Sequence, residues 1–389
     1  MHCPQISDSM TSTLSESIPA ALEALEKALD AHPERRIDLA EQAIMRGELR
    51  RHPAMYIGHA PDTDAASNAP RQAPPKRSPE ERLLNKLRGA TGGLAMHNQI
   101  APRVGLGKGT GTIPASFGTV LVAELGDTPS GERPIDEVLA EGLPDPESSG
   151  VIPEMREDIE TALALTPDWI QISPPDMQGP FNIAHMILGT DAFLLPLDEP
   201  EKFRELMTLV TDFFLALSDN LRRWIPPARF PQFPTATCRL AECSVNMMSP
   251  EVYIEHILPH DLRIAAHYGQ AAIHPCSGPH VFRATLQHLP NVVCTEAGYI
   301  AKAYAGSIGV DEALAEIGGR PIILGIGEEL PEGREEEFIR RDLDRARTNP
   351  RLSFGFTGMH WQSRDQEKIR QMHLRLDEYW ARHVFDLAL

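Results

Sequence analysis

The sequence predicts an α/β protein built as a closed (β/α)8 TIM barrel with an N-terminal helical extension. Three observations support this fold. From residue 150 onward, helical patterns alternate with short apolar runs, and such alternation gives parallel strands joined by crossover helices. No glycine-rich dinucleotide fingerprint accompanies a first strand. The repeat count is high, which favours a closed barrel over an open sheet.

The elements of the barrel are defined by the spacing of apolar residues. Helical periodicity covers residues 154–165, 200–224, 250–268, 279–289, 311–317, 334–348 and 363–385. Apolar runs expected to form strands cover residues 169–172, 271–273, 292–294, 321–324 and 352–354. We therefore assign residues 79–389 to a TIM-barrel catalytic domain.

The N-terminal part of the chain has a different composition. Apolar residues recur at three- and four-residue spacing over 12–51, and Pro33 separates two predicted helices. Residues 60–78 are rich in Pro, Ala, Asp and Asn, which is typical of an exposed linker. These patterns predict an N-terminal helical extension over 1–59 and a linker or arm over 60–78.

Composition excludes several classes of function. A formal net charge of −18 argues against nucleic acid or an anionic membrane as a partner, because either requires a basic face. No apolar run reaches the roughly 18 residues of a membrane span, and the N-terminal residues lack the pattern of a secretory signal. The five cysteines are scattered and do not form a disulfide-framework pattern. We expect a cytoplasmic protein that acts on a small-molecule substrate.

A glycine-dense segment, Val-Gly-Leu-Gly-Lys-Gly-Thr-Gly, covers residues 104–111. A P-loop requires Ser or Thr after its Gly-Lys pair, whereas Gly109 follows Lys108 here. A dinucleotide fingerprint requires a clear strand before it, and residues 99–102 are a poor strand. The segment therefore disfavours nucleotide binding and leaves two interpretations, a close backbone approach to a substrate and a plain loop.

The apolar run at 271–273 leads into His274 and Cys276 before a Ser-Gly-Pro sequence ends the strand. Residues i and i+2 of a strand point to the same side, so the imidazole and the thiol are expected to converge where the strand meets its loop. These two donors suit zinc. The alternative is a buried histidine beside an inert thiol.

Polar side chains follow the predicted strands, at the end where TIM-barrel enzymes hold their active sites. Glu242 and Cys243 precede the predicted helix that starts at residue 250. The residues that we predict to line a substrate pocket are Asp176, Gln178, Asn182, Glu296 and His360. The alternative for each of them is an ordinary loop or helix-cap residue.

Two segments resemble the uroporphyrinogen decarboxylase superfamily. The first is Asp-Met-Gln-Gly-Pro-Phe at 176–181, followed by Gly189 and by Asp-Glu-Pro-Glu at 198–201. The second starts with Ser-Pro-Glu at 249–251 and runs through Pro259 to the His-Pro-Cys-Ser-Gly sequence that contains His274. The resemblance covers roughly residues 100–385. It implies a (β/α)8 barrel with one of two chemistries, which are cofactor-free decarboxylation of a tetrapyrrole and zinc-dependent methyl transfer between corrinoid proteins and thiols.

The resemblance is closer to the methyltransferase branch. The arginine motif that marks the decarboxylases is absent, since the basic Arg-Arg-His-Pro at 50–53 has different surroundings. His274 and Cys276 match the His-x-Cys pair of the methyltransferases. The cysteine that those enzymes carry in the last barrel loop is missing here, because residues 355–361 read Gly-Phe-Thr-Gly-Met-His-Trp.

The resemblance implies a zinc site with three protein ligands and one open position. We take Glu242 as the third ligand and catalytic residue beside His274 and Cys276, with Cys243 and His360 as alternatives for that position. Bound zinc would lower the pKa of a thiol so that the thiolate exists at neutral pH. A corrinoid, as a substrate or on a partner protein, would donate the methyl group.

Two other functions stay open. One is a cofactor-free decarboxylase or related lyase, in which Arg239 or Lys302 would hold substrate carboxylates. The other is a non-catalytic barrel that binds a corrinoid or a tetrapyrrole. The family resemblance also implies a homodimer.

Overall fold

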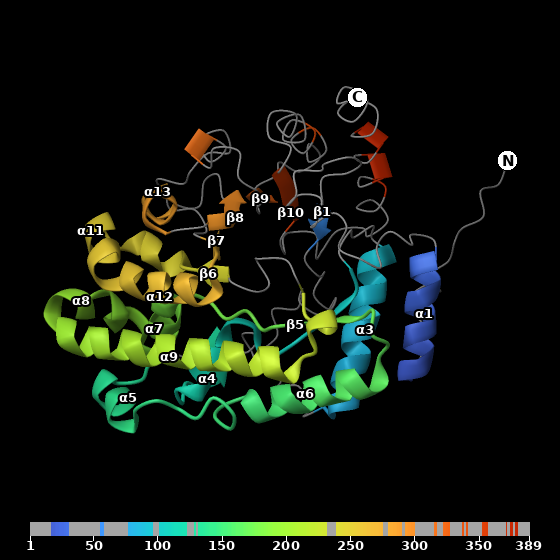
Figure 1. Ribbon diagram of the computed structural model, residues 1–389, viewed down its shortest axis with the longest axis horizontal. Helices are drawn as coiled ribbons and strands as arrows, with labels where there is room; N and C mark the ends of the chain where they lie inside the picture. Colours follow the sequence, from blue (N-terminus) through green and yellow to red (C-terminus); the bar gives the residue numbers. More distant parts are fainter. Residues whose placement is uncertain are drawn as a thin grey trace.

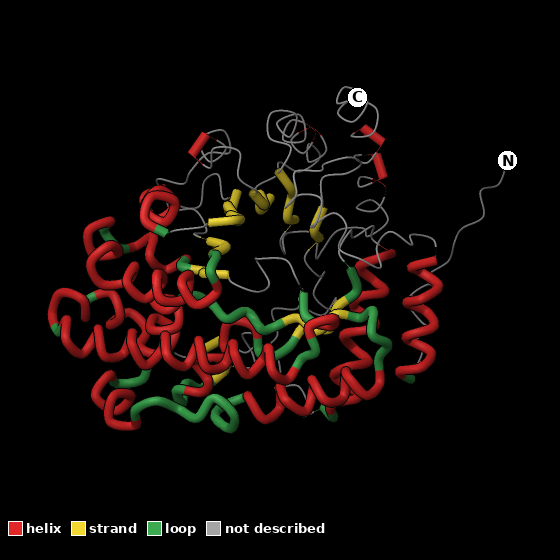
Figure 2. The backbone as a smooth tube through the Cα atoms, viewed as in Figure 1, coloured by secondary structure: helices red, strands yellow, loops and turns green. Residues whose placement is uncertain are grey.

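The computed structural model describes residues 17–30, 55–57, 77–95, 101–122, 128–129, 131–231, 239–274, 279–289, 292–299, 322–326 and 352–356, with a few isolated C-terminal positions. Short strands gather in the middle of the molecule, and helices surround them below and at both ends in the view of Figures 1 and 2. The helices predicted over 311–317, 334–348 and 363–385 fall almost entirely outside the described residues.

The strands of the described residues form two parallel groups. The six-stranded sheet has the order β1 (Met55–Ile57), β10 (Leu352–Phe356), β9 (Ile322–Ile326), β8 (Val292–Tyr299), β7 (Ala271–His274) and β6 (Arg239–Ala241). β2 (Arg103–Gly105) pairs in parallel with β5 (Gln171–Ser173). Six and two strands match the number that the predicted barrel requires. In the chain, β2 and β5 fall between β1 and β6, the two edge strands of the six-stranded sheet. Closure of the barrel stays a prediction.

Each apolar run predicted as a strand overlaps one of these strands, but β1, β2 and β6 are too short to show an apolar run of their own. β1 is notable because it lies within segment 1–59, which the sequence places in a helical extension. It pairs in parallel with β10, with Met55 opposite Phe354. The N-terminal segment therefore supplies a strand to the sheet as well as the helix α1 (Ile18–Asp30). A small antiparallel pair, β3 (Leu121–Val122) and β4 (Thr128–Pro129), lies apart from both groups.

The helices predicted over 154–165, 200–224 and 279–289 are confirmed as α6 (Ile152–Leu165), α9 (Pro200–Trp224) and α13 (Pro279–His288). The helix predicted over 250–268 is divided into α11 (Pro250–Val252), the π-helix η9 (Tyr253–Ile257) and α12 (Leu258–Tyr268). Pro259 explains the division, since it lacks the N–H that continuous α-helical hydrogen bonding would require. The remaining α-helices of the described residues are α3 (Pro79–Ala95), α4 (Thr112–Ser116), α5 (Ile135–Glu141), α7 (Pro180–Leu188) and α8 (Leu195–Asp198).

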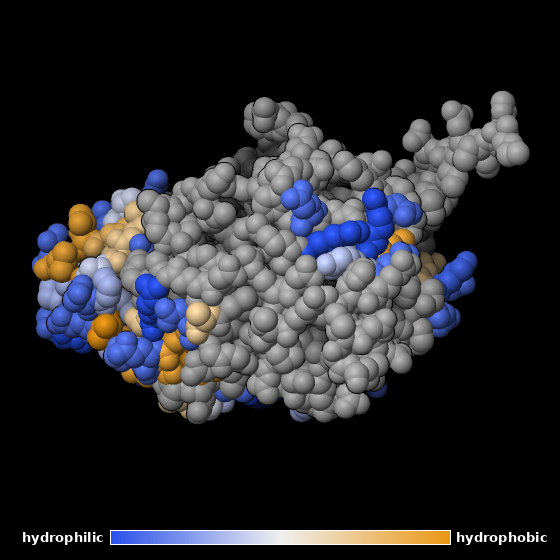
Figure 3. Space-filling view, turned by 90° about the horizontal axis from the view of Figure 1, so that it is seen from above, coloured by the Kyte–Doolittle hydropathy of each residue, from blue (hydrophilic) through white to orange (hydrophobic). Residues whose placement is uncertain are grey.

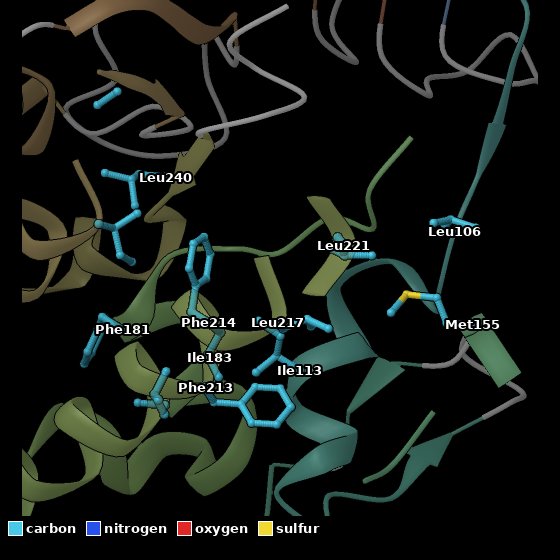
Figure 4. Packing of buried hydrophobic residues seen from close by; sticks show 14 of the residues in the cluster. Leu106, Ile113, Met155, Phe181, Ile183, Phe213, Phe214, Leu217, Leu221 and Leu240 are labelled. Carbon is cyan, nitrogen blue, oxygen red and sulfur yellow. The ribbon is translucent and has the colours of Figure 1, made fainter. Parts of the chain in front are cut away.

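The buried core is centred on α9. Its residues Phe203, Phe213 and Leu217 belong to a fully buried face with helical spacing. Figure 4 shows Phe213 and Leu217 beside Ile183 of α7, and the ring centroids of Phe203 and Phe181 lie 6.1 Å apart. Burying each such side chain contributes roughly 1.5–3 kcal/mol. This packing fixes α7, the helix on which the candidate site is built.

The surface of the molecule is mixed in character. Figure 3 shows apolar side chains grouped at the end where Figure 1 places α8 and α11. Exposed apolar residues in the segments around these helices are Leu194, Leu197, Met247 and Ile254. Among the described residues, no helix combines the length and the hydropathy that crossing a membrane requires.

Candidate functional site

His274 is the last residue of β7, and strand register defines the direction of its side chain. It pairs with Ala241 of β6, and Ala272 pairs with Arg239. Paired residues of parallel strands share a face of the sheet, so these four side chains lie on one face. The intervening residues Leu240 and Ile273 belong to the buried core cluster. His274 therefore points away from the surrounding helices, as expected for a residue at the mouth of a barrel. Cys276, its predicted partner, lies outside the described residues.

Glu242 follows β6 directly, and its carboxylate closes the N-terminus of α7. The oxygen Oε1 accepts the backbone N–H of Phe181 at 3.1 Å, and Oε2 accepts that of Asn182 at 3.2 Å. The first turn of a helix has N–H groups without intrahelical partners and favours negative charge. The N-cap residue Gly179 has no side chain with which to satisfy these groups. A carboxylate that is about 60 residues away in sequence therefore takes over the capping role.

Gly179 leaves the space that the Glu242 carboxylate occupies. A Cβ atom at residue 179 would lie 2.7 Å from Cγ of Glu242 and nearer still to its carboxyl carbon. The Gly179 N–H also donates to the carbonyl of Ala241 at 2.8 Å. The loop after β5 is thus hydrogen-bonded to the end of β6 at Gly179, where the close contact with Glu242 leaves no space for a side chain.

A second carboxyl group, that of Asp261 on α12, meets Glu242 in the same space. The two carboxyl groups are close enough to alter each other's pKa, and the Tyr253 hydroxyl donates to Oδ2 of Asp261 at 3.0 Å. Glu242 is 2% exposed, and Asp261 and Tyr253 are 0% exposed. Two buried carboxyl groups this close to each other favour uptake of a proton, because two adjacent negative charges away from water repel each other.

Burial is the main cause of unusual acidity in this pair. It raises the pKa of Asp261 to about 7, although hydrogen bonds to Tyr253 and Glu242 act in the opposite direction. It also raises the pKa of Glu242 well above the usual range, and the charge of Asp261 adds to this shift. The Tyr253 hydroxyl has a raised pKa for the same reasons, burial first and the two carboxylates next. Burial therefore shifts all three groups toward their protonated forms.

The predicted pocket residues Gln178 and Asn182 belong to a network around the first turn of α7. The Asn182 side chain donates to Oε1 of Gln178 at 2.8 Å, and its Oδ1 accepts the backbone N–H of Ser244 at 2.7 Å. Gln178 has a φ of 60°, a conformation that is uncommon for a residue with a side chain. Both side chains are buried. The network holds the loop after β5 against the segment after β6.

Two further side chains extend this polar region. His185 of α7 has its Nδ1 atom 2.7 Å from the hydroxyl oxygen of Ser244, and burial lowers the pKa of the imidazole. Asp176 forms an ion pair of 2.6 Å with Arg239, a residue on the same face of the sheet as His274. Arg239 therefore already has a carboxylate partner in this structure.

The structure brings some of the predicted site residues together and separates others. Gln178, Asn182 and Glu242 surround the start of α7. Glu242 and His274 are joined through the backbone, since the Glu242 N–H donates to the His274 carbonyl at 3.2 Å. Their side chains diverge. His274 shares one face of the sheet with Ala241, whereas the carboxylate of Glu242, the next residue, reaches α7 and α12. Glu296 lies within β8 opposite Ile323 and not after the strand. His360 lies outside the described residues.

The described residues do not complete the predicted zinc site. They contain no group of three or more His, Cys, Asp or Glu side chains that could hold a metal ion. Both oxygens of Glu242 are already used at α7. Cys243, the first alternative, is disulfide-bonded and so does not offer a thiolate. A zinc site that includes His274 would need its other donors from outside the described residues.

The glycine-dense segment is a structured loop in this region. Lys108 lies 3.2 Å from Glu154 in an ion pair, and its backbone N–H donates to the Thr112 hydroxyl. A Cβ atom at Gly107, which has a φ of 70°, would lie 2.9 Å from Pro175. The glycine is therefore explained by the approach of the loop after β5. This observation favours the plain-loop interpretation.

Sequence reasoning missed Asp261, Tyr253, Ser244 and His185. One signal could have found Asp261, because it lies at helical spacing from Leu258, Ile264 and Ala265, which are buried. A carboxylate on an apolar helix face needs a specific partner. Nothing in the sequence identifies Glu242 as that partner, since the two residues meet only through the packing of α12 against the strand.

Comparison with known proteins gives a likeness of fold. No family model matches the sequence, and no curated protein matches it. Among solved structures, a methyltransferase from Methanosarcina mazei is similar with a TM-score of 0.59 and 13% sequence identity. The match covers 87% of this chain and 97% of that one. At this identity the likeness establishes the fold and leaves the activity to be argued separately.

Proposed function

We propose that this chain is a closed (β/α)8-barrel enzyme that transfers a methyl group between a corrinoid donor and a thiol. The observation that carries the proposal is the position of His274 at the end of β7, on the face of the sheet opposite to Leu240 and Ile273, which belong to the large buried cluster. This is where a barrel enzyme places its reactive groups. The fold likeness to a methyltransferase over most of both chains supports the same reading.

The proposal assigns zinc to His274 and Cys276, the two donors of the His-x-Cys sequence. Glu242 is committed to α7 and Cys243 is disulfide-bonded, so His360 is the remaining candidate for the third ligand. Zinc, when bound, would supply Lewis acidity that lowers the pKa of a substrate thiol.

The described residues have roles that do not depend on the metal. Gln178 and Asn182 hold the loop after β5 in place beside β6, where a substrate would enter. Asp176 and Arg239 place one positive and one negative group on the face that carries His274. This ion pair suits a polar substrate. It offers no excess positive charge that could hold a substrate carboxylate. The decarboxylase alternative is therefore less well supported, because Arg239 is balanced by Asp176.

Metal analysis of the purified protein tests the proposal. We expect about one zinc per chain after purification without chelators, and loss of zinc in His274→Ala and Cys276→Ala while circular dichroism shows an intact fold. A His360→Ala variant tests the third position in the same way. Folded wild-type protein that stays free of zinc after incubation with the ion would refute the metal assignment.

Two partner predictions belong to the same proposal. A homodimer would give twice the chain mass of 43.0 kDa in light scattering. A corrinoid-carrying partner would be replaceable by free methylcobalamin at high concentration, because the reactive methyl group is the same. A cytoplasmic location is part of the proposal and is tested by fractionation of cells that express the chain.

A further inference from the structure

The strongest unexplained feature of the molecule is the buried group formed by Glu242, Asp261 and Tyr253. No ion pair of the described residues includes either carboxyl group, whereas Asp158, also buried, is paired with Arg82 and Lys86. Burying a carboxyl group away from cations is costly. A cost of this kind is usually offset by a role in the structure or the chemistry of a site.

We infer that Glu242 and Asp261 are positioning residues. They hold the ends of β6 and β7 in place around His274 and do not themselves bind the metal. Glu242 is the central member, because it is attached to three parts of the chain. Its side chain caps α7 at Phe181 and Asn182. Its backbone N–H is bonded to the His274 carbonyl, and its carboxyl group lies beside that of Asp261.

The positioning acts first on the loop that leads into α7. Capping of the first turn fixes Asn182, whose side chain holds Gln178 and the backbone of Ser244. The Gly179 N–H is bonded to Ala241, the residue before Glu242. The loop and the strand end are thus linked on both sides of the Glu242 carboxylate, and neither can shift without breaking the cap.

The second contribution comes from Asp261 and Tyr253. The π-helical turn η9 places Tyr253 so that its hydroxyl reaches Asp261, eight residues further along. Asp261 lies beside the Glu242 carboxyl group. The segment from α11 to α12 therefore meets the same strand end as α7. The effect of Asp261 on His274 passes through Glu242, whose backbone N–H donates to the His274 carbonyl.

A ligand role and a positioning role for Glu242 make different predictions in Glu242→Gln. This substitution keeps the size of the side chain and one acceptor oxygen, but it removes the charge that a zinc ligand supplies. Glu242→Ala removes the cap altogether. Asp261→Asn and Tyr253→Phe each weaken the second contribution, and Glu205→Gln, at an exposed position on α9, is the matched control.

The test combines amide hydrogen exchange with zinc analysis on the full-length variants. In Glu242→Ala we expect exchange of the Phe181 and Asn182 amides to become about tenfold faster, with a smaller increase in Asp261→Asn. Exchange within α6 stays unchanged, and Glu205→Gln behaves as wild type. Glu242→Gln should largely restore protection at these amides and retain the wild-type zinc content, whereas His274→Ala loses zinc.

Two outcomes would overturn the inference. One is loss of zinc in Glu242→Gln as complete as in His274→Ala, with normal protection of Phe181 and Asn182, which would make Glu242 a ligand. The other is unchanged exchange of these amides in Glu242→Ala. If the wild type binds no zinc, the metal assignment fails by itself, and the exchange measurements still decide the positioning role. If Glu242→Ala does not fold, the comparison of Glu242→Gln, Asp261→Asn and the double variant decides the positioning role. The double variant should then lose less stability than the sum of the losses in the two single variants.

Discussion

The carboxyl groups of Glu242 and Asp261 lie close together between β6, α7 and α12, with both side chains almost completely buried. Glu242 caps a helix that starts about 60 residues earlier in the chain, and Asp261 accepts the Tyr253 hydroxyl. This relationship connects the ends of β6 and β7 to the helices that surround them. It also makes the stability of the protein depend on pH in a defined direction.

The first prediction concerns Asp261→Asn. In the folded protein the pKa of Asp261 is about 7, whereas an unfolded aspartate has a pKa near 3.9. The folded state therefore binds more protons between these two values, and the contribution of the pair to stability falls as pH rises through this window. We expect the free energy of unfolding of Asp261→Asn, relative to wild type, to rise by the order of 1–3 kcal/mol between pH 5 and pH 8.

Urea denaturation at several pH values measures this difference. Asp191→Asn is the control, because Asp191 is exposed and its substitution should give a small and nearly constant difference from wild type. A difference between Asp261→Asn and wild type that does not change with pH would mean that Asp261 is ionised in the folded protein.

The second prediction concerns Gly179→Ala. The added methyl group would meet the Glu242 carboxylate, so either α7 or Glu242 must move. We expect a loss of roughly 1–3 kcal/mol in stability and faster amide exchange at the start of α7. Gly105→Ala is the control, because a Cβ atom at residue 105 would have nothing within 4 Å. Equal stabilities of the two variants would contradict the close contact between Gly179 and Glu242.

The third prediction concerns His260, which lies between α12 and α9. Burial lowers the pKa of His260 to about 4, and Arg263 acts in the same direction. Its Nδ1 atom lies 3.1 Å from the Thr211 hydroxyl oxygen. An unfolded histidine titrates near pH 6.5, so the unfolded state binds more protons between about pH 4 and 6.5. The stability that this neutral histidine contributes is therefore lost as pH falls through that window.

His260→Gln should remove this dependence. The free energy of unfolding of the variant, minus that of the wild type, should increase by on the order of 1–3 kcal/mol as the pH falls from 7 to 4.5. The difference is needed because the Glu242–Asp261 pair gives a slope of opposite sign over part of the same range. A His267→Gln control, at an interaction with Asp219 near the surface, should show no such gain. An identical pH profile for wild type and His260→Gln would show that His260 is protonated in the fold.

The fourth prediction concerns Arg229, a buried cation that closes the C-terminal end of α6. Its Nε atom donates to the Ile170 carbonyl at 2.5 Å, and an Nη atom donates to the Thr166 hydroxyl at 2.7 Å. Removal would leave buried acceptors without donors, so Arg229→Ala should lose about 2–4 kcal/mol. Arg204→Ala, at an exposed position, should change stability by less than about 0.5 kcal/mol. A cost for Arg229→Ala as small as that for Arg204→Ala would contradict the role assigned to Arg229.

Much of the fold could be predicted because its elements carry regular patterns. α6 and α9 have apolar residues at helical spacing, and β7, β9 and β10 are apolar runs. The strands β1, β2 and β6 have three residues each, which is too few for a periodic signal. They are strands because neighbouring strands supply hydrogen-bond partners, and that information is absent from the local sequence.

The candidate site could be predicted only in part. Gln178, Asn182 and Glu242 were selected by their position after a strand, and the structure brings them together around the start of α7, but their roles stay predictions. It could not distinguish a metal ligand from a helix cap, because the cap depends on where α7 begins in space relative to β6. Asp261 was hidden for the same reason, since its partner is 19 residues away in sequence and on another element. Cys276 and His360 stay predictions, because both lie outside the described residues.

The most direct test of the proposed function is methyl transfer from methylcobalamin to a simple thiol, followed by the change in corrinoid absorbance. The proposal predicts turnover by wild-type protein loaded with zinc, loss of turnover in His274→Ala, and retained turnover in Glu205→Gln. Absence of transfer by folded, zinc-loaded wild type with a panel of small thiols, or undiminished transfer by His274→Ala, would contradict it.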